Sequence, residues 1–444
     1  MTSTAVLVGI PNVGKSSIFN ALTSSKEALV SDIPGTTRDR CYGFIDRDEQ
    51  SLLLVDTGGL TDHQANIQTQ LNIQAWLAIE EADLILLVVD ARQPLTDYEI
   101  ELAQQLRKSE KPVMLIANKT DNDDILARCD TEYYKLGFKH IHPLSAKTRH
   151  GVDDLLLDLL PFFSTRPIDL DQTQRPNISI IGRPNAGKST LFNRLIQKNR
   201  SIVSDMPHTT TSATKHELKI KYRDQSTTFD LIDTAGIRRK NKVEQGIESL
   251  SIIQSLKMIH DSDLAIFLID GMQEISQQDI GLIYLCLRRG LTVVIAINKI
   301  DDMDDYQKRM IEMNIRERCR VIEHVPIVFI SALENKRIQT LLRQVLKAYQ
   351  SRFIQNNTSY LTRLLSQATQ QQSPPIRQGV RPRLQFAHPV AGRKLAIIIQ
   401  GKRLKELPQS YLRYLEQFYR KKLGLIGTNV ALILKQDKNP YQPS

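Results

Sequence analysis

The stretch "GRPNAGKST" runs from Gly182 to Thr190, and "GIPNVGKSS" runs from Gly9 to Ser17, 173 residues earlier. Each matches G-x-x-x-x-G-K-[ST], follows an apolar strand-like run and precedes an amphipathic helix-like run. In that setting the glycines let the backbone wrap around a phosphate group, while the loop N–H groups and the helix N-terminus face the anion. The sequence therefore predicts two phosphate-binding loops of the same kind in one chain.

The apolar runs around each loop follow the same order. Residues 1–163 hold four strand-like runs separated by helix-like stretches: "TAVLVGI", "SLLLVDT", "DLILLVVDA" and "KPVMLIANK". The order restarts at "NISIIGRPNAGKST" and continues through "TTFDLIDTAG", "DLAIFLIDG" and "TVVIAINKID". Strands alternating with helices at this spacing indicate a mostly parallel sheet with helices on both faces. A repeat of this size predicts a duplicated α/β domain rather than a solenoid.

The domain organisation follows from this repeat and from a length that suggests roughly three domains. We expect the first α/β domain at 1–163 and the second at 177–350, joined by a polar, proline-containing linker at 164–176. In residues 351–444, two helix-like stretches and three strand-like runs predict a small α+β domain. Its last helix-like stretch, "PQSYLRYLEQFYRKKLG", has proline at its start and glycine at its end, as helix termini prefer.

The positive charge of the chain is concentrated in this third domain. Residues 351–444 contain 16 Lys and Arg against 3 Asp and Glu, a net charge of +13, whereas the remainder contains 43 against 46, a net charge of −3. Such an asymmetry predicts a polyanionic partner, and nucleic acid is the first candidate. The candidate RNA-contacting residues are Arg377, Arg381, Arg383, Arg393 and Lys394.

Each α/β domain also carries an acidic strand end that suits a metal ion. "DTGG" begins at Asp56 and "DTAG" begins at Asp233, 47 and 51 residues after the first glycine of the respective loop. A carboxylate in this place lies near a loop-bound Mg²⁺, and the last glycine N–H can reach the terminal phosphate. The expected Mg²⁺ ligands are Ser16 with Asp56 in the first copy and Ser189 with Asp233 in the second.

Two later strand ends carry a motif for the nucleotide base. "NKTD" and "NKID" end with Asp121 and Asp301, and "SAK" and "SAL" further on fit a loop behind the base. A fixed carboxylate can accept hydrogen bonds from N1–H and the exocyclic amine of guanine, whereas adenine offers no such donor pair on that edge. An adenine-nucleotide enzyme is therefore the weaker alternative. The candidate nucleotide-binding residues are Gly9, Asn12, Gly14, Lys15, Ser16, Ser17, Asp56, Asn118, Lys119, Asp121, Ser145 and Ala146, and in the second copy Gly182, Asn185, Gly187, Lys188, Ser189, Thr190, Asp233, Asn298, Lys299, Asp301, Ser331 and Ala332.

These motifs resemble those of the translation-factor-like branch of the P-loop GTPases. Two such domains followed by a small basic α+β domain resemble, over essentially the whole chain, the Der (EngA) family of bacterial ribosome-assembly GTPases. The resemblance implies hydrolysis of GTP to GDP and phosphate, a KH-like third domain, and action on the large ribosomal subunit and its rRNA. It also implies an activating K⁺ ion held by Asn12 and Asn185, for which a turn-favouring asparagine is the alternative.

The resemblance assigns catalytic groups by their position in the family motifs. They are Lys15, Thr36, Thr37 and Gly59 in the first copy and Lys188, Thr209, Thr210 and Gly236 in the second, with Thr37 and Thr210 as further Mg²⁺ ligands. Leu60 and Ile237 stand where Ras-type enzymes have a water-orienting glutamine, which predicts slow intrinsic turnover. In the first switch segment, copy one has "PGTTRDR", but copy two has "PHTTTSA" with His208 in place of glycine. We therefore expect the second copy to bind nucleotide, whereas hydrolysis there depends on whether the altered switch segment is functional.

The third domain contains a literal G-x-x-G, at Gly424 and Gly427. KH domains use such a loop between two helices to clamp a nucleic-acid backbone. Here the two glycines lie between the last helix-like stretch and the last strand-like run. The position favours a helix C-cap and a turn.

The remaining expectations concern location and assembly. No run approaches the roughly 18 uncharged apolar residues of a membrane-spanning helix, and the N-terminus does not resemble a signal peptide. We expect a cytoplasmic monomer without a membrane partner. The alternative to a two-site hydrolase is a nucleotide-gated RNA- or ribosome-binding module in which one site is hydrolytically silent.

Overall fold

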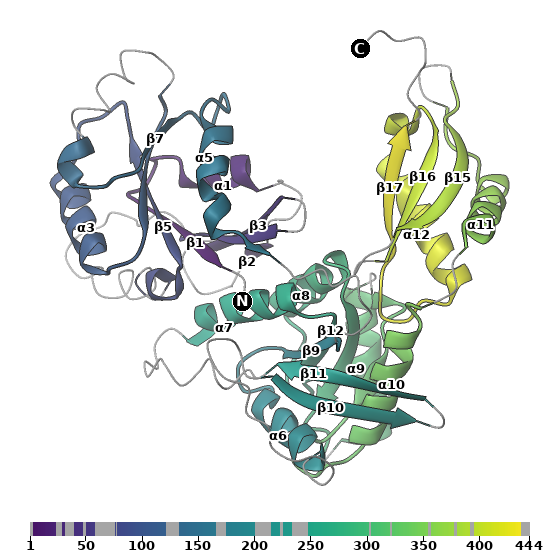
Figure 1. Ribbon diagram of the computed structural model, residues 1–444. Helices are drawn as coiled ribbons and strands as arrows, with labels where there is room; N and C mark the ends of the chain where they lie inside the picture. The colour runs from purple at the N-terminus through teal and green to yellow at the C-terminus, as the bar shows by residue number, and fades with distance from the viewer. Residues whose placement is uncertain are drawn as a thin grey trace. The chain divides into compact units, whose positions relative to one another are not determined.

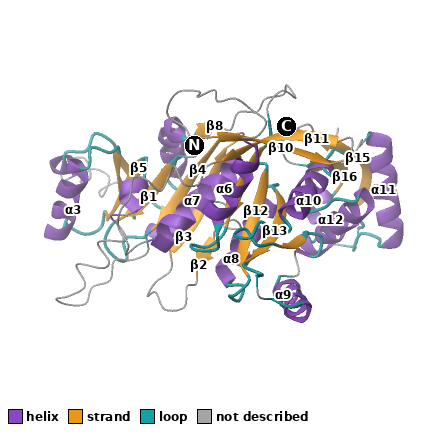
Figure 2. Ribbon diagram, turned by 90° about the horizontal axis from the view of Figure 1, so that it is seen from below, coloured by secondary structure: helices purple, strands orange, loops and turns teal. Residues whose placement is uncertain are grey.

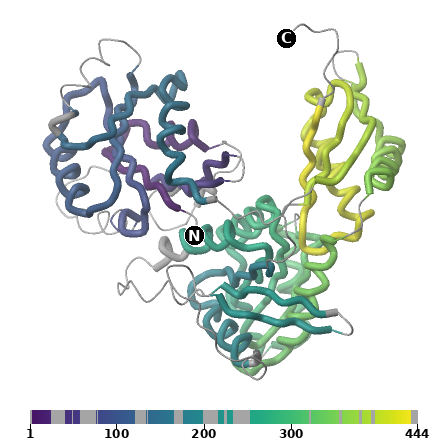
Figure 3. Tube along the Cα trace, in the orientation of Figure 1, coloured from purple at the N-terminus to yellow at the C-terminus, as the bar shows by residue number. Residues whose placement is uncertain are grey.

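The computed structural model divides into two compact units, Met1–Pro167 with Asn241–Asp261 and Ile168–Lys240 with Ser262–Ser444. Figures 1 and 3 follow the elements of each unit along the chain by colour. Helix α7 (Ile247–Asp261) belongs to the first unit. The structure describes residues 3–23, 29–31, 40–47, 50–57, 76, 78–120, 133–165, 175–199, 215–222, 225–232, 247–301, 303–319, 322–353, 357–376, 380–390 and 395–436.

An eight-stranded sheet forms the centre of the first unit, in the order β2-β3-β4-β1-β5-β6-β7 with β8 paired to β4. Strands β4, β1, β5, β6 and β7 are parallel, while β3 pairs antiparallel with both β2 and β4. Helices α1 and α5 lie on one side of the sheet and α3 on the other (Figure 1). The bounds are β1 Thr4–Val8, β2 Leu29–Ser31, β3 Arg40–Arg47, β4 Gln50–Asp56, β5 Leu84–Asp90, β6 Val113–Asn118, β7 Ile141–Leu144, β8 Ser164–Thr165, α1 Lys15–Leu22, α3 Asp97–Lys108 and α5 Val152–Leu159.

The central strands of this sheet are buried on both faces. Alternate residues such as Leu7, Leu54 and Leu86 form one core with Phe19 of α1 and Leu155 of α5. The intervening strand residues, such as Val6, Val55 and Leu87, are equally buried. This explains why the strands are continuous apolar runs in the sequence, without alternation of polar and apolar residues.

The second unit begins with a six-stranded sheet in the order β10-β11-β9-β12-β13-β14, in which only β10 is antiparallel to its neighbour. Helices α6 and α10 share a core with one face, and α8 packs against β12 and β13. The predicted pair of mostly parallel α/β folds is thus confirmed. The bounds are β9 Asn177–Ile181, β10 Lys215–Tyr222, β11 Gln225–Ile232, β12 Leu264–Asp270, β13 Thr292–Asn298, β14 Ile327–Phe329, α6 Lys188–Asn199, α8 Gln277–Arg288, α9 Asp305–Arg318 and α10 Ile338–Gln350.

The end of the chain forms the predicted small α+β fold. Strand β16 pairs antiparallel with β15 and parallel with β17, and α11 and α12 lie beside this sheet (Figure 2). Gly424 closes α12 with a left-handed backbone (φ 64°), so the reading of this glycine as a helix cap is confirmed. The bounds are α11 Thr358–Gln371, β15 Arg383–Val390, β16 Ala396–Lys402, α12 Gln409–Leu423 and β17 Ala431–Gln436.

The boundaries at residues 163, 176 and 350 stay predictions. The first two residues of the predicted linker, Ser164 and Thr165, form β8 and pair with Ser51 and Gln50. Within the described parts of the chain, no helix is long and apolar enough to cross a membrane.

Candidate nucleotide sites

Each phosphate-binding loop joins the carboxyl end of a central strand to the first turn of a helix. The first loop connects β1 to α1, and the second connects β9 to α6. Gly14 (φ 96°) and Gly187 (φ 97°) have left-handed backbones, and a Cβ on them would lie 2.2 Å from Asn118 Nδ2 and 2.3 Å from Asn298 Nδ2. Only glycine allows this backbone to approach the asparagine so closely.

The lysine of each loop folds back over the loop carbonyls. Lys15 Nζ donates to the carbonyls of Gly9 (2.8 Å) and Ile10 (2.7 Å). Lys188 Nζ makes the same two bonds, to Gly182 and Arg183, both at 2.6 Å. Burial lowers the pKa of Lys15 to about 8, although the negative charge of Asp56 partly opposes that shift. The ammonium is thus held at the mouth of the loop by neutral acceptors.

Two of the predicted Mg²⁺ ligands of the first copy, Ser16 and Asp56, lie together. Ser16 Oγ donates to Asp56 Oδ2 over 2.8 Å, and Asp56 is 1% exposed at the end of β4. A hydroxyl beside a carboxylate matches the oxygen ligands that Mg²⁺ prefers. In the second copy Ser189 is described, whereas Asp233 lies outside the described residues.

One asparagine in each copy links the three sequence motifs. Asn118 Nδ2 donates to the carbonyl of Val13 (2.8 Å), and its Oδ1 accepts from the N–H of Ala146 (3.2 Å). Asn298 makes the equivalent bonds to Ala186 and Ala332, both at 2.9 Å. The asparagine therefore fixes the phosphate loop, the end of the base-motif strand and the "SA" loop relative to one another.

The lysine after this asparagine pairs with an acidic residue that we did not predict. Lys119 Nζ lies 2.5 Å from Asp90 Oδ2, and Lys299 Nζ lies 2.6 Å from Asp270 Oδ2. Asp90 and Asp270 end the strands "LILLVVD" and "LAIFLID", 180 residues apart. Their recurrence at the same place in both copies is the signal by which these aspartates could have been predicted.

The carboxylate that we predict to bind guanine is described only in the second copy. Asp301 Oδ1 is buried and has no hydrogen-bond partner among the described residues. A buried acceptor without a donor is costly, so this atom suits a ligand that brings an N–H group. Asp121, its counterpart in the first copy, lies outside the described residues.

The described residues therefore bring together the phosphate loops, the asparagine-lysine pairs and the "SA" loops. Asn12 (φ 65°) and Asn185 (φ 62°) have left-handed backbones, a conformation that asparagine tolerates in turns, and their K⁺ role stays a prediction. The other predicted site residues that lie outside the described residues are Thr36, Thr37, Gly59, Thr209, Thr210, Gly236, Arg377, Arg393 and Lys394.

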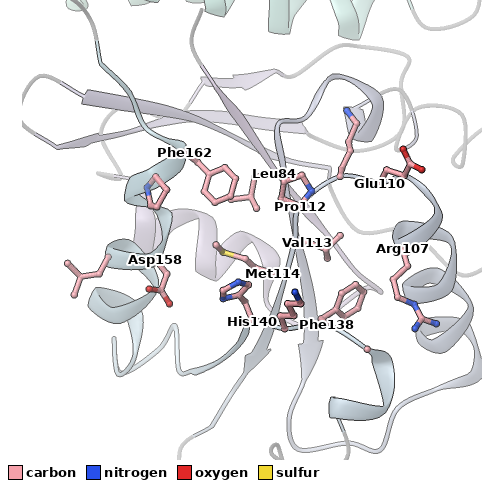
Figure 4. A pocket seen from close by; sticks show the side chains of 15 residues that line it. Leu84, Arg107, Glu110, Pro112, Val113, Met114, Phe138, His140, Asp158 and Phe162 are labelled. Atoms are coloured by element: carbon pink, nitrogen blue, oxygen red, sulfur yellow. The ribbon is translucent and has the colours of Figure 1, made fainter.

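A cavity of about 620 Å³ lies elsewhere in the first unit (Figure 4). Its lining includes Leu84 and Val113, which begin β5 and β6, whereas the nucleotide motifs follow the ends of these strands. Ligands of open parallel sheets bind beyond the carboxyl ends of the strands. This cavity is therefore not part of the nucleotide site.

The fold and the two sites define a protein with tandem P-loop domains of the GTPase type. A family model described as a 50S ribosome-binding GTPase matches residues 4–119 and 177–299. A second model, described as the C-terminal KH-domain-like part of EngA bacterial GTPase enzymes, matches residues 355–435.

Full-length relatives agree with these family models. GTPase Der of Coxiella burnetii is 39% identical over 443 residues, covering 100% of this chain and 99% of the relative. GTPase Der of Aliivibrio fischeri is 36% identical and that of Legionella pneumophila is 37% identical, covering 100% and 99% of this chain and 95% and 94% of the relatives. The chain belongs to the GTPase Der family. It is a GTP-hydrolysing enzyme with a KH-like third domain, as the sequence predicted.

Proposed function

We propose that this GTPase binds GTP at two sites and uses them to control the contact of its third domain with rRNA during assembly of the large ribosomal subunit. We further propose that it acts as a monomer in the cytoplasm. The observation that carries the proposal is a basic, partly aromatic face of the KH-like sheet. The printed description of the matching family model, a 50S ribosome-binding GTPase, supports the same partner.

This face, here called the open sheet face, follows from strand register. Ile397 and Ile399 of β16 point into the core, so the alternate residues of β16 point to the other side. Lys402 pairs with Arg383, and Gln400 pairs with both Phe386 and Lys435. Residues directly opposite each other share a face. The open sheet face therefore consists of Arg383, Phe386, His388, Ile398, Gln400, Lys402, Ile433 and Lys435.

The chemistry of the open sheet face suits RNA. Phe386 is 54% exposed and Ile433 is 46% exposed, whereas Arg383, Lys402 and Lys435 are exposed cations around them. Cations neutralise phosphates, and an exposed aromatic ring can stack on an unpaired base. Arg381, also exposed, extends the same positive region. The predicted contacts of Arg381 and Arg383 thus remain part of this proposal.

In the nucleotide sites, each residue has a proposed task. Lys15 and Lys188 move from the loop carbonyls to the β- and γ-phosphates, and Asp301 accepts from guanine, as Asp121 would in the first site. Ser16 with Asp56, and Ser189 with Asp233, hold Mg²⁺, which supplies positive charge to the phosphate oxygens. Thr37 in the first site and Thr210 in the second are the remaining Mg²⁺ ligands. Asn12 and Asn185 hold the activating K⁺ from their positions in the loop turns.

Co-sedimentation with isolated ribosomal subunits tests the proposal. The full chain should pellet with large subunits, and the amount should differ between GDP, a non-hydrolysable GTP analogue and no nucleotide. The double variant Lys402→Glu with Lys435→Glu should pellet less. The double variant Lys219→Glu with Lys221→Glu makes the same charge change at exposed positions of β10 and is the matched control. Equal pelleting with small and large subunits in every state would refute the proposal.

In the alternative function, one site binds nucleotide without hydrolysing it. Single-turnover hydrolysis distinguishes this alternative from a protein with two hydrolytic sites. Lys15→Ala and Lys188→Ala each remove one phosphate-binding lysine. If both sites hydrolyse GTP, each variant should lose part of the turnover. If Lys188→Ala keeps the full rate while Lys15→Ala abolishes it, the second site is silent and the alternative is correct.

A further inference from the structure

The two phosphate loops differ at the residue after the first glycine. This residue is Ile10 in the first loop and Arg183 in the second. In both loops its carbonyl accepts a hydrogen bond from the loop lysine, Lys15 or Lys188. The position therefore lies in the backbone that holds the phosphate-binding lysine, while its side chain differs in charge and length.

The side chain of Arg183 ties the second loop to α8. Its Nε lies 2.9 Å from Asp279 Oδ2, and its Nη2 donates to the carbonyl of Glu274 over 2.8 Å. Asp279 is 1% exposed, and the Arg183 side chain is 24% exposed. These two anchors, five residues apart along the chain, fix the direction of the guanidinium, and a charge-assisted bond to a buried carboxylate is stronger than an exposed one.

Asp279 is itself held in place by the start of α8. Its Oδ2 accepts from the N–H (3.0 Å) and the Oγ (2.9 Å) of Ser276, which completes a capping box. The buried carboxylate thus meets an arginine and two further donors, so its burial is compensated. Arg183 is attached to a rigid helix terminus rather than to a mobile surface side chain.

The first copy has a carboxylate at the position of Asp279 but no arginine at the position of Arg183. Glu99 occupies the corresponding place in the capping box of α3, 180 residues before Asp279, and is 3% exposed. It bonds to the N–H (2.9 Å) and the Oγ1 (2.8 Å) of Thr96. Ile10 offers no donor from its side chain. The first loop therefore lacks the tether, although the contacts of its lysine and of Asn118 match those of the second copy.

We propose that Arg183 is a positioning residue that slows the release of guanine nucleotide from the second site by tethering the phosphate loop to Asp279. The inference rests on the proposed assignment of the two nucleotide sites. A tethered loop loses less conformational freedom when phosphate binds, and it opens less readily to let phosphate leave. Differences of affinity between closely related sites arise mostly from dissociation rates. Because Ile10 forms no such tether, release of nucleotide from the first site is not slowed in this way.

Dissociation of fluorescent GDP from the full chain tests the tether. Lys15→Ala confines binding to the second site. In that background, Arg183→Ile replaces the arginine by the residue of the first loop. This variant should release GDP about tenfold faster, because one buried charge-assisted pair is lost. Arg183→Lys, which keeps a cation near Asp279, should fall between the two. Arg318→Ile removes an exposed arginine that bonds to the same 274–275 segment, and it should leave release unchanged.

A double-mutant cycle shows whether the effect passes through the pair. Asp279→Asn alone should accelerate release, and combining it with Arg183→Ile should add little further acceleration. Unchanged release in Arg183→Ile, or fully additive effects in the double variant, would overturn the inference. A lowered melting temperature with wild-type release would also overturn it, because the role would then be structural. The site assignment fails separately if Lys188→Ala in the Lys15→Ala background still binds GDP.

Discussion

The ammonium group of Lys119 lies 2.5 Å from the carboxylate of Asp90 and also donates to the carbonyl of Asn12 over 2.8 Å. Lys119 has a left-handed backbone (φ 70°), so its side chain turns back toward the phosphate loop. The pair therefore connects the end of β5, the base motif and the first phosphate loop. The same ion pair recurs between Lys299 and Asp270 in the second copy.

Replacing Asp90 by asparagine should weaken nucleotide binding at the first site. Asp90→Asn removes the charge that holds Lys119, and we expect about tenfold weaker GDP binding, or about 1.4 kcal/mol. Equilibrium titration in the Lys188→Ala background measures the first site alone. Asp97→Asn, an exposed aspartate at the start of α3, is the control. Equal affinities for the two variants would show that Asp90 does not position the lysine.

The lowered pKa of Lys15 predicts a pH dependence for the first site. Burial lowers this pKa from 10.5 to about 8, so the ammonium is charged below pH 8 and loses its proton above it. Phosphate binds the charged form, so affinity should fall as the pH rises through 8, by up to about tenfold per pH unit above it. Calorimetry in buffers of different ionisation enthalpy should also detect proton uptake on binding at about pH 8.5. This pH is about half a unit above the pKa of Lys15, so most of the free lysine is neutral there. Proton-neutral binding there would contradict the assigned pKa.

The glycines of the first loop and of α12 should differ in their tolerance of alanine. Gly14→Ala places a Cβ 2.2 Å from Asn118 Nδ2, whereas a Cβ on Gly424 meets nothing within 4 Å. Both changes strain a left-handed backbone by about 1–2 kcal/mol. Only Gly14→Ala should also abolish GDP binding at the first site, because Asn118 must move. Thermal unfolding and GDP titration of both variants in the Lys188→Ala background measure the two effects.

The open sheet face should contribute measurably to the salt dependence of RNA binding. Replacing Arg383, Lys402 and Lys435 by glutamine removes three cations, which should reduce the slope of log K against log salt by about 2 for single-stranded RNA. Fluorescence anisotropy with a short rRNA fragment at several salt concentrations measures this slope. Phe386→Ala should lower affinity without changing the slope, since stacking carries no charge. An unchanged slope in the triple variant would place the RNA elsewhere.

Local sequence was sufficient for the motifs and the fold class, because each depends on short-range chemistry. Gly14 and Gly187 are needed for a backbone that few other residues adopt, and runs such as "LILLVVD" reflect strands buried on both faces. Asn118 and Asn298 could be assigned to the two nucleotide sites because each ends a strand in the same sheet as the strand that leads into its phosphate loop. The order of these motifs predicted the duplicated domain and the family.

The tertiary structure decided which side chains of distant segments meet. Lys119 contacts Asp90, and Arg183 contacts Asp279, 29 and 96 residues away along the chain. Such partners cannot be inferred from spacing, because the sheet brings strand ends and helix starts together regardless of their separation in sequence. The sequence by itself determined that there are two matching phosphate loops. The fold determined that Arg183 of the second loop meets the buried carboxylate of Asp279, whereas Ile10 of the first loop has no charge to offer to Glu99.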